Sequence, residues 1–364
     1  MTDSAMRSRE LVQRLTDALA DEAALLGHVR IMHVCGTHEH EIRRFALRSL
    51  LPSNLEVIAG PGCPVCITPA SAIATAISLA QLDQRPMLCT YGDIVRVPIE
   101  SGSLWSQRAA GADVRIVYGP RDAVRLAREN PERTVIFFSV GFETTAAPVA
   151  GLLLGELPDN LLLYCCHRYV PPAVRTLAQD DDGFISGYLL PGHAAVITGT
   201  RAYEFLPEQC NAASAVTGFE PVDVLSGLLS ILRQLRTGEP HVANCYPRAV
   251  RAAGNERAQA VLAEVFDIED ASWRGIGVLP GTGFKLKERF AAHDALMRLG
   301  LSEVPADDIL PGCQCHKVVV GRLQPDQCGL FGSRCTPEHP QGPCMVGNEG
   351  TCRAAYLFPE NDDD

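Results

Sequence analysis

Short apolar segments alternate with amphipathic segments along the first two thirds of the chain. Continuous runs of apolar and β-branched residues predict strands at residues 30–34, 55–59, 86–90, 114–118, 134–140, 161–165, 184–188 and 213–217. Helical periodicity between them predicts helices over residues 8–26, 40–51, 70–82, 121–129 and 222–235. Fully apolar strands that alternate with helices are typical of parallel sheets covered on both faces. We therefore expect an α/β fold.

The same pattern predicts four segments. Residues 1–28 are expected to form an N-terminal helix that packs on a C-terminal domain. A break at Gly119-Pro120 predicts two consecutive Rossmann-like parallel α/β domains, residues 29–119 and 120–238. Residues 239–364, with a helix near 252–266, are expected to form a separate C-terminal cysteine-rich domain. Residues 311–359 are rich in Cys, Gly and Pro, so something other than an apolar core must stabilise them.

Charge and hydropathy exclude two classes of partner. The net charge of -11 argues against a nucleic-acid surface, which needs a basic face. No apolar run approaches the roughly 20 residues that span a bilayer. The amino terminus lacks the apolar core of a secretion signal, so we expect a cytoplasmic protein without a membrane or nucleic-acid partner. Neither a Walker motif nor a strand-following Gly-x-Gly-x-x-Gly indicates a nucleotide site.

The 14 cysteines are unusual for a chain of this kind. Clustered cysteines in a reducing compartment are more often metal ligands or redox-active thiols than structural disulfides. The carboxyl-terminal region contributes Cys313, Cys315, Cys328, Cys335, Cys344 and Cys352.

The spacing of these carboxyl-terminal cysteines favours an iron–sulfur cluster. The paired Cys-x-x-Cys turns of zinc sites are absent there, and four thiolates from several loops suit a [4Fe–4S] cluster. A structural zinc site with spare thiols is the alternative. Cys313 and Cys315 are too close in sequence to chelate together easily, so one is expected to ligate and the other to face another thiol. The spare pair is then a candidate disulfide that exchanges electrons with the cluster.

A second group of thiols follows the first two predicted strands. Cys35 ends the first strand and precedes a helix, a position where α/β sheets bind ligands and where the helix dipole favours a thiolate. His38 and Glu39 lie one turn away. Cys63 and Cys66 form a Cys-x-x-Cys pair that opens a helix, a familiar dithiol geometry. If the two strands are neighbours, all three thiols open onto one cleft.

Other loops at predicted strand ends carry polar residues among glycines and prolines. They are Gly141-Phe142-Glu143-Thr144-Thr145, Pro191-Gly192-His193 and Gly218-Phe219-Glu220-Pro221. Glu143 and His193 are therefore further candidates for the cleft, although each segment alone is also an ordinary helix start. Cys89, Cys165, Cys166, Cys210 and Cys245 match no motif and are interpreted as structural.

Taken together, these segments resemble the HypD family of [NiFe]-hydrogenase maturation factors. The matching motifs are CGTHE (35–39), GPGCPVCITP (60–69), GFETT (141–145), PGH (191–193), GFEP (218–221) and LQPDQCGLFGSRCTPEHPQGPCMVGNEGTC (323–352). The resemblance thus covers nearly the whole chain. It implies two similar α/β domains and a cluster-bearing third domain around a cleft.

The resemblance also implies partners and a task. Family members work with a HypC-type chaperone and a HypE-type cyanide donor to assemble the Fe(CN)2CO unit of hydrogenase. Cys35 would then hold the transient iron that carries the cyanide and carbonyl ligands, and Cys63 and Cys66 would be the dithiol facing it. Thr37, His38, Glu39, Glu143 and His193 complete the expected site.

For the cluster, the resemblance implies a ligand set like that of ferredoxin:thioredoxin reductase. Cys313, Cys328, Cys335 and Cys352 would be the ligands, and Cys315 and Cys344 the adjacent disulfide. The expected role is an assembly scaffold with thiol and cluster redox activity, rather than a turnover enzyme. The rival interpretations are a general cluster-dependent thiol–disulfide reductase and a plain interaction scaffold.

Overall fold

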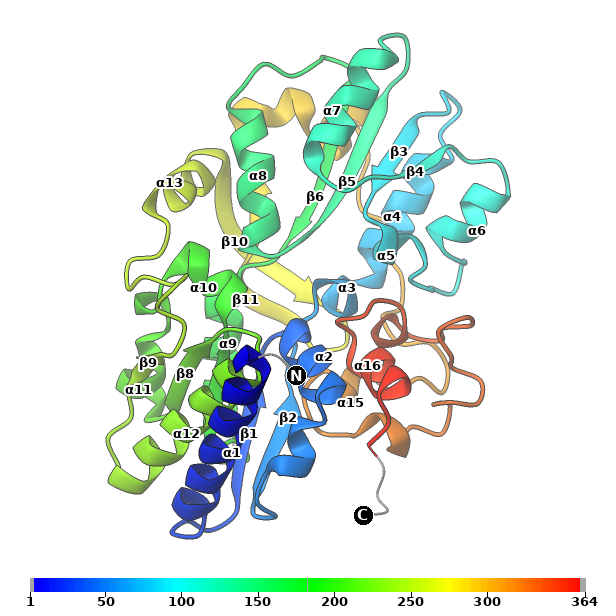
Figure 1. Ribbon diagram of the computed structural model, residues 1–364. Coiled ribbons are helices and arrows are strands. Elements are labelled where there is room, and N and C mark those ends of the chain that lie inside the picture. Colours follow the sequence, from blue (N-terminus) through cyan, green and yellow to red (C-terminus); the bar gives the residue numbers. More distant parts are fainter. Residues whose placement is uncertain (1–2, 182, 361–364) are drawn as a thin grey trace.

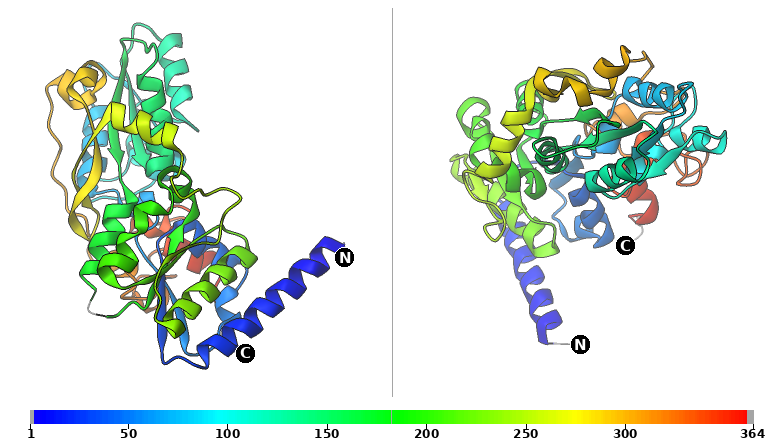
Figure 2. Two further views of the ribbon diagram at one scale, coloured as in Figure 1. Left: turned by 90° about the vertical axis from the view of Figure 1, so that its left-hand side faces the viewer. Right: turned by 90° about the horizontal axis from the view of Figure 1, so that it is seen from above.

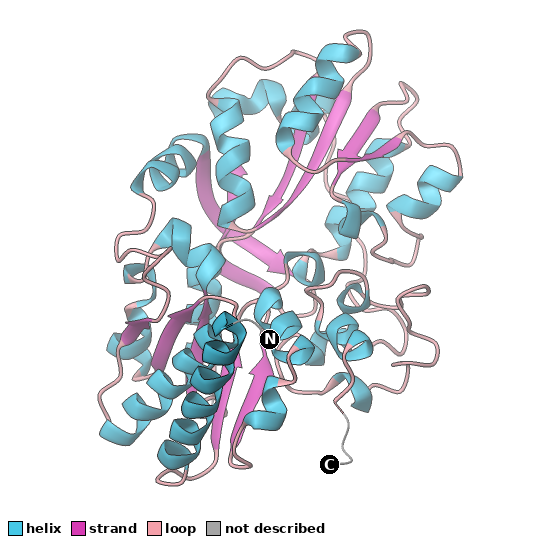
Figure 3. Ribbon diagram, in the orientation of Figure 1, coloured by secondary structure: helices cyan, strands magenta, loops and turns pink. Residues whose placement is uncertain are grey.

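The computed structural model describes residues 3–181 and 183–360 and contains two parallel β-sheets (Figures 1 and 3). The first sheet consists, in spatial order, of β2 (Leu55–Ala59), β1 (Val29–His33), β7 (Gly187–Pro191), β8 (Ala213–Thr217) and β9 (Val242–Asn244). The second consists of β4 (Val114–Ile116), β3 (Met87–Thr90), β5 (Val135–Gly141) and β6 (Leu161–His167). Every pairing in both sheets is parallel, which confirms the α/β class.

Helices connect and cover these strands. The amino-terminal half contributes α1 (Asp3–Ala23), α2 (Gly36–Arg44), η1 (Leu47–Leu50), α3 (Pro64–Ile67), α4 (Ala70–Ala80), α5 (Gly92–Val95), α6 (Leu104–Ala109), α7 (Pro120–Glu129), α8 (Glu143–Leu153) and α9 (Val170–Gln179). The rest are α10 (Gly192–Thr198), η2 (Arg201–Tyr203), α11 (Phe205–Cys210), α12 (Pro221–Thr237), α13 (Glu256–Val265), η3 (Glu288–His293), α14 (Ala295–Leu299), α15 (Cys315–Val318), η4 (Pro325–Gln327), η5 (Pro343–Met345) and α16 (Thr351–Leu357). In the described residues, no helix is both long and apolar enough to cross a bilayer.

The chain visits the two sheets in an interleaved order. It builds β1 and β2, leaves to form all four strands of the second sheet, and then returns to complete the first. The expected boundary between residues 119 and 120 is therefore wrong. Gly119 is the N-cap of α7 and Pro120 its first residue, so this break starts a helix inside the second sheet's unit.

The first sheet is buried on both faces because successive apolar residues of its strands point to opposite faces. Ile31, Leu189 and Ala215 face a core shared with α1 and α12. Their neighbours Met32 and Leu190 face a second core, which includes α9, α10 and α11. Two cores of this kind also flank the second sheet, with α4 on one face and α7, α8 and α13 on the other.

The amino-terminal helix packs on the first sheet's lobe. Leu19 and Ala23 of α1 are fully buried in the same core as Leu228 and Leu232 of α12. Glu22 accepts hydrogen bonds from Arg233 and Arg236 of α12. The expectation that this helix packs on the C-terminal domain is wrong, because an amphipathic pattern reveals an apolar face but not its partner. The beginning of α1 extends beyond the body of the molecule (Figure 2).

An antiparallel hairpin, absent from the sequence prediction, lies between the two sheets (Figure 1). Its strands are β10 (Phe266–Trp273) and β11 (Gly277–Leu286). Tyr169, which follows β6, donates its backbone N–H to the Thr282 carbonyl of β11 at 2.8 Å. The expected boundary at residue 239 also fails, because β9 completes the first sheet and α13 covers the second.

The cysteine-rich part, residues 311–360, has short helices and turns as its regular structure in the described chain. It packs beside α2 and α3 (Figure 1). Its small apolar cluster includes Val318, Val319 and Met345 together with Cys63 and Cys66. The carboxyl-terminal cysteines are thereby placed directly against the second motif's thiols.

Candidate functional site

The first two motifs meet because β1 and β2 are parallel neighbours, with His33 opposite Ala59. Cys35 is the N-cap of α2 and is only 6% exposed. The backbone N–H of Gly36 donates to the carbonyl of Gly62 at 3.0 Å. A Cβ on Gly62 would overlap the backbone of Cys35, so a glycine is required for this approach. The loops that carry Cys35 and the dithiol therefore lie against each other, but the three cysteines are buried rather than exposed on an open cleft.

The dithiol opens a helix as predicted. Cys63 is the N-cap of α3, and its sulfur accepts the backbone N–H of Cys66 at 3.4 Å. Both sulfurs are free thiols, and both residues are buried. Burial raises the pKa of Cys66 well above its ordinary value.

The protonation state expected for Cys35 is wrong for the metal-free chain. Burial, with a smaller contribution from the Glu349 carboxylate, raises the pKa of Cys35 to about 12. Backbone and side-chain hydrogen bonds from Thr37 and His38 lower it by less. Desolvation therefore outweighs the start of α2, and Cys35 is a thiol until a cation displaces its proton.

Glu349 is a site residue that the sequence prediction missed. The Thr37 hydroxyl donates to Glu349 Oε1 at 2.8 Å, and burial raises the pKa of this carboxyl. A Cβ on Gly36 would lie 2.5 Å from the carbonyl oxygen of Glu349. The available signal was that Glu349 is the carboxylate flanked by glycines in Gly347-Asn348-Glu349-Gly350.

His38 joins three of the predicted motifs. Its Nε2 lies 2.9 Å from the carbonyl oxygen of Gly218 and 3.0 Å from the hydroxyl of Thr217. The ring of Phe219 lies 4.9 Å from the His38 ring and stacks on the His193 ring at 4.0 Å. The structure therefore brings PGH and GFEP to CGTHE.

The same contacts define the state of the His38 ring. Burial lowers the pKa of His38 to about 3, so the imidazole is neutral. Because a carbonyl only accepts, Nε2 carries the hydrogen and Nδ1 keeps a lone pair. Nδ1 is buried and has no hydrogen-bond partner in the described residues.

Glu39 has a different environment from Cys35, despite their shared motif. Its carboxylate accepts hydrogen bonds from His33 at 2.8 Å and from Arg43 and Arg48 at 2.6 Å each. The Arg48 guanidinium and the hydrogen bond from His33 hold the pKa of Glu39 well below its usual range. Both oxygens are committed to these contacts, which indicates a structural role.

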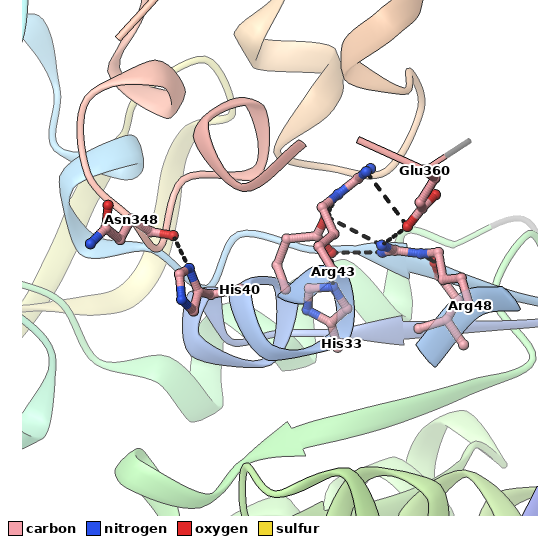
Figure 4. Close-up of polar contacts among 8 residues, drawn as sticks. His33, His40, Arg43, Arg48, Asn348 and Glu360 are labelled. Atoms are coloured by element: carbon pink, nitrogen blue, oxygen red, sulfur yellow. Dashed lines mark hydrogen bonds and ion pairs between the residues drawn. The ribbon is translucent and has the colours of Figure 1, made fainter. Parts of the chain in front are cut away.

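This charged cluster also attaches the end of the chain to α2 (Figure 4). Arg48 and Arg43 reach Glu360 at 3.0 and 3.5 Å. His40 Nδ1 lies 3.2 Å from the carbonyl oxygen of Asn348. The segment that carries Glu349 is therefore fixed to the helix that carries Cys35.

Glu143 lies in a separate cavity that has no cysteine in its lining. Its Oε1 accepts the backbone N–H of Val170 at 2.8 Å, whereas Oε2 is buried without a partner in the described residues. Burial raises the pKa of Glu143 to about 7. The structure does not place this residue among the thiols.

All six carboxyl-terminal cysteines line one cavity, together with apolar residues and Gly342. The sulfurs of Cys315 and Cys344 are 2.7 Å apart, and both are free thiols. Cys344 also has side-chain contacts with Cys352 and with Cys66. An uninterrupted series of thiols thus connects the dithiol to this cavity.

The cavity has features that suit a polynuclear cluster. A Cβ on Gly342 would lie 2.5 Å from the Cys313 sulfur, and the neighbouring backbone N–H of Gln341 donates to the Cys335 sulfur at 3.3 Å. Hydrogen bonds from N–H groups to sulfur are among the means by which proteins tune iron–sulfur clusters. In the described residues, no three His, Cys, Asp or Glu side chains are arranged to hold a single metal ion.

The cysteines interpreted as structural lie elsewhere. Cys89 is in β3, Cys165 and Cys166 are in β6, Cys210 ends α11, and Cys245 follows β9. None of them lines the cysteine cavity.

Comparison with known proteins identifies the family. A family model described as "HypD: Hydrogenase formation hypA family" matches residues 10–359. The chain is 40% identical to Hydrogenase maturation factor HypD2 of Bradyrhizobium diazoefficiens, over 97% of this chain and 95% of that protein. It is 40% identical to Hydrogenase maturation factor HypD of Escherichia coli, over 98% and 97% of the two chains. The HypD factor of Cupriavidus necator is 39% identical, over 97% and 95%. The chain belongs to the HypD family of hydrogenase maturation factors.

Proposed function

We propose that this maturation factor is a redox-active scaffold on which the Fe(CN)2CO unit of [NiFe]-hydrogenase is assembled, with a HypC-type chaperone and a HypE-type cyanide donor. The observation that carries the proposal is the series of thiols from Cys66 through Cys344 to Cys315. At the dithiol end of this series, the loop that precedes Cys63 packs against the loop of Cys35. Both loops follow the carboxyl ends of β1 and β2, where α/β sheets bind ligands.

In this proposal Cys35 holds the cargo iron. Iron binding replaces the thiol proton, which burial otherwise retains on Cys35. Neutral His38 offers Nδ1 as a hydrogen-bond acceptor, and the Glu349 carboxyl fixes Thr37 beside the cysteine. The site is buried, so water is largely excluded from the iron's ligands.

A [4Fe–4S] cluster held by Cys313, Cys328, Cys335 and Cys352 would supply electrons one at a time. Cys315 and Cys344 are the pair that passes reducing equivalents onward by thiol–disulfide exchange. The Cys344 thiolate attacks the Cys66 sulfur of a Cys63–Cys66 disulfide, and Cys63 leaves as a thiolate. The Cys315 thiolate then attacks Cys344 and releases Cys66. The dithiol beside Cys35 is thereby reduced, and the Cys315–Cys344 pair becomes a disulfide.

The burial of the thiols favours this scaffold over a general thiol–disulfide reductase. Cys35 and Cys63 are each 6% exposed, and Cys66 is 3% exposed. A disulfide in a folded protein substrate needs direct access to the attacking sulfur. A small cargo such as a liganded iron fits this enclosed position better.

The separation of roles is tested with Cys35→Ala, purified without air together with the HypC-type chaperone. We expect the infrared bands of cyanide and carbonyl on iron to disappear, while the broad visible absorbance of the cluster remains. Cys245→Ser, which changes a cysteine outside the thiol series, is the control and should retain both signals. Simultaneous loss of the bands and the absorbance in Cys35→Ala would refute the assignment of separate roles.

A further inference from the structure

Arg274 is a buried cation whose position no motif predicted. It follows β10 directly and is only 4% exposed. Its backbone N–H donates to the carbonyl of Ile67, the last residue of α3, at 2.8 Å. Arg274 is therefore fixed to the helix that carries the dithiol.

The guanidinium is oriented by neutral acceptors. Nε donates to the carbonyl of Asp308 at 2.8 Å, and Nη2 donates to the carbonyl of Pro98 at 3.1 Å. The Asp308 carboxylate instead accepts the backbone N–H groups of Ala70 and Gly275. Nη1 is buried and has no hydrogen-bond partner in the described part of the chain. Neutral carbonyls orient the guanidinium but do not neutralise its charge. The buried positive charge therefore interacts with other groups nearby.

The groups nearby are the redox cysteines. Arg274 lines a small cavity together with Cys313, Cys315 and Gly342. Burial lowers the pKa of Arg274, and the nearby groups of Cys315, Asp308, Cys313 and Cys344 act against this shift. Its charge thus acts on sulfurs at the junction between the cluster cavity and the dithiol.

We propose that Arg274 is a positioning residue whose fixed charge stabilises the reduced, more negative state of the redox centre in the cysteine cavity. This inference rests on the proposed function, because it requires a cluster in that cavity. Each electron added there increases the negative charge, and a nearby cation in a low-dielectric interior lowers the free energy of that state. Removal of the cation therefore lowers the reduction potential.

The test is an anaerobic redox titration of the cluster-loaded full chain, followed by electron paramagnetic resonance. Arg274→Gln removes the charge but keeps hydrogen-bond donors. We expect the ratio of reduced to oxidised cluster at a fixed potential to fall at least about tenfold, which is about 59 mV for a one-electron couple. Arg274→Lys keeps the charge and should remain within about threefold of the wild type.

Arg168→Gln is the matched control. Arg168 is also buried, and it donates from Nε and Nη2 to the Ser272 carbonyl on the strand that precedes Arg274. It is absent from the lining of the cysteine cavity, so its loss should leave the potential unchanged.

Three results would overturn the inference. An unchanged potential in Arg274→Gln would show that the charge does not act on the centre. If Arg274→Gln folds without loading a cluster, Arg274→Lys decides. A tenfold fall in its ratio of reduced to oxidised cluster, with the charge intact, would also show that the charge is not what sets the potential. A wild-type chain that takes up no cluster would overturn the inference and the proposed cofactor together, whereas the first two results leave the proposed function standing.

Discussion

Cys35 and Glu39 lie one helical turn apart at the start of α2, but their chemical states are opposite. Burial keeps Cys35 protonated, whereas three cationic or hydrogen-bonding neighbours keep Glu39 ionised. The difference follows from partners: a buried charge is stable only where other groups compensate its desolvation. At the residue scale, the motif therefore contains one reactive group and one structural ion.

We expect Glu39→Gln to destabilise the fold by about 3 kcal/mol, because buried Arg43 and partly buried Arg48 lose the Glu39 carboxylate and keep only the more exposed Glu360 as an anionic partner. The pKa of Glu39 is lower in the folded than in the unfolded chain. Its contribution to the free energy of unfolding is therefore complete above the pKa that this carboxyl has in the unfolded chain, and it is lost only in acid. Urea unfolding at neutral pH measures the difference. Glu41→Gln, which breaks the more exposed pair with Arg44 on the same helix, is the control and should cost about 1 kcal/mol or less. Equal effects of the two variants would contradict the structural role of Glu39.

Glu143 should make stability depend on pH near neutrality. Its pKa is about 7 in the fold and 4.5 for the ordinary group, so the unfolded chain releases this proton first as pH rises. Stability attributable to Glu143 therefore falls by about 3 kcal/mol between these two values and is level outside them. Glu143→Gln should remove this slope in urea midpoints measured from about pH 4.5 to 7. A slope as steep as in the wild type, or the same flattening in the exposed control Glu132→Gln, would contradict the assignment.

At the scale of elements, the loop that follows β2 depends on the absence of a side chain at Gly62. A Cβ there would overlap the backbone of Cys35, so Gly62→Ala should destabilise the chain and separate the dithiol from Cys35. Gly151→Ala, in the last turn of α8 and with open space where the Cβ would lie, should instead stabilise it by about 0.5–1 kcal/mol. Thermal unfolding distinguishes them. A melting temperature of Gly62→Ala equal to or above that of the wild type would show that the close approach of Gly62 to the Cys35 backbone is unimportant.

Elements with a strong pattern were predicted well, and weakly patterned ones were not. The fully apolar β5 and β6 and the long amphipathic α12 lie close to their predicted ranges. The hairpin was missed because much of β10 is exposed, so it has no continuous apolar run. The few buried residues of β10 are covered by other elements of the fold, and a local sequence pattern does not encode such contacts.

At the scale of the whole molecule, the sequence could not predict which strands belong to which sheet. Each sheet is built from βα units of similar appearance, and nothing in β7 distinguishes a return to β1 from a pairing with β6. The consecutive-domain expectation failed for this reason. The thiols could be predicted because their chemistry is specific. For Glu349 the sequence offered only its flanking glycines, and for Arg274 it offered no motif, so their roles follow from the packing of the carboxyl-terminal segment and the hairpin against α2 and α3.

The interleaved path has a functional consequence. Parts of the chain from residue 63 to residue 352 contribute to one series of thiols, which places the proposed electron path within a single packed core. The continuity of this path is the central claim, and the contact between Cys66 and Cys344 is its critical step.

That step is tested most directly by trapping it. In the double variant Cys63→Ser and Cys315→Ser, both thiols that would resolve the exchange are absent, so mild oxidation of the folded protein should join Cys66 to Cys344. Mass spectrometry of peptides from unreduced protein identifies the link. We predict that the Cys66–Cys344 disulfide is the principal new cross-link. If both cysteines remain free, or pair only with other residues, the proposed path from the cysteine cavity to Cys35 is wrong.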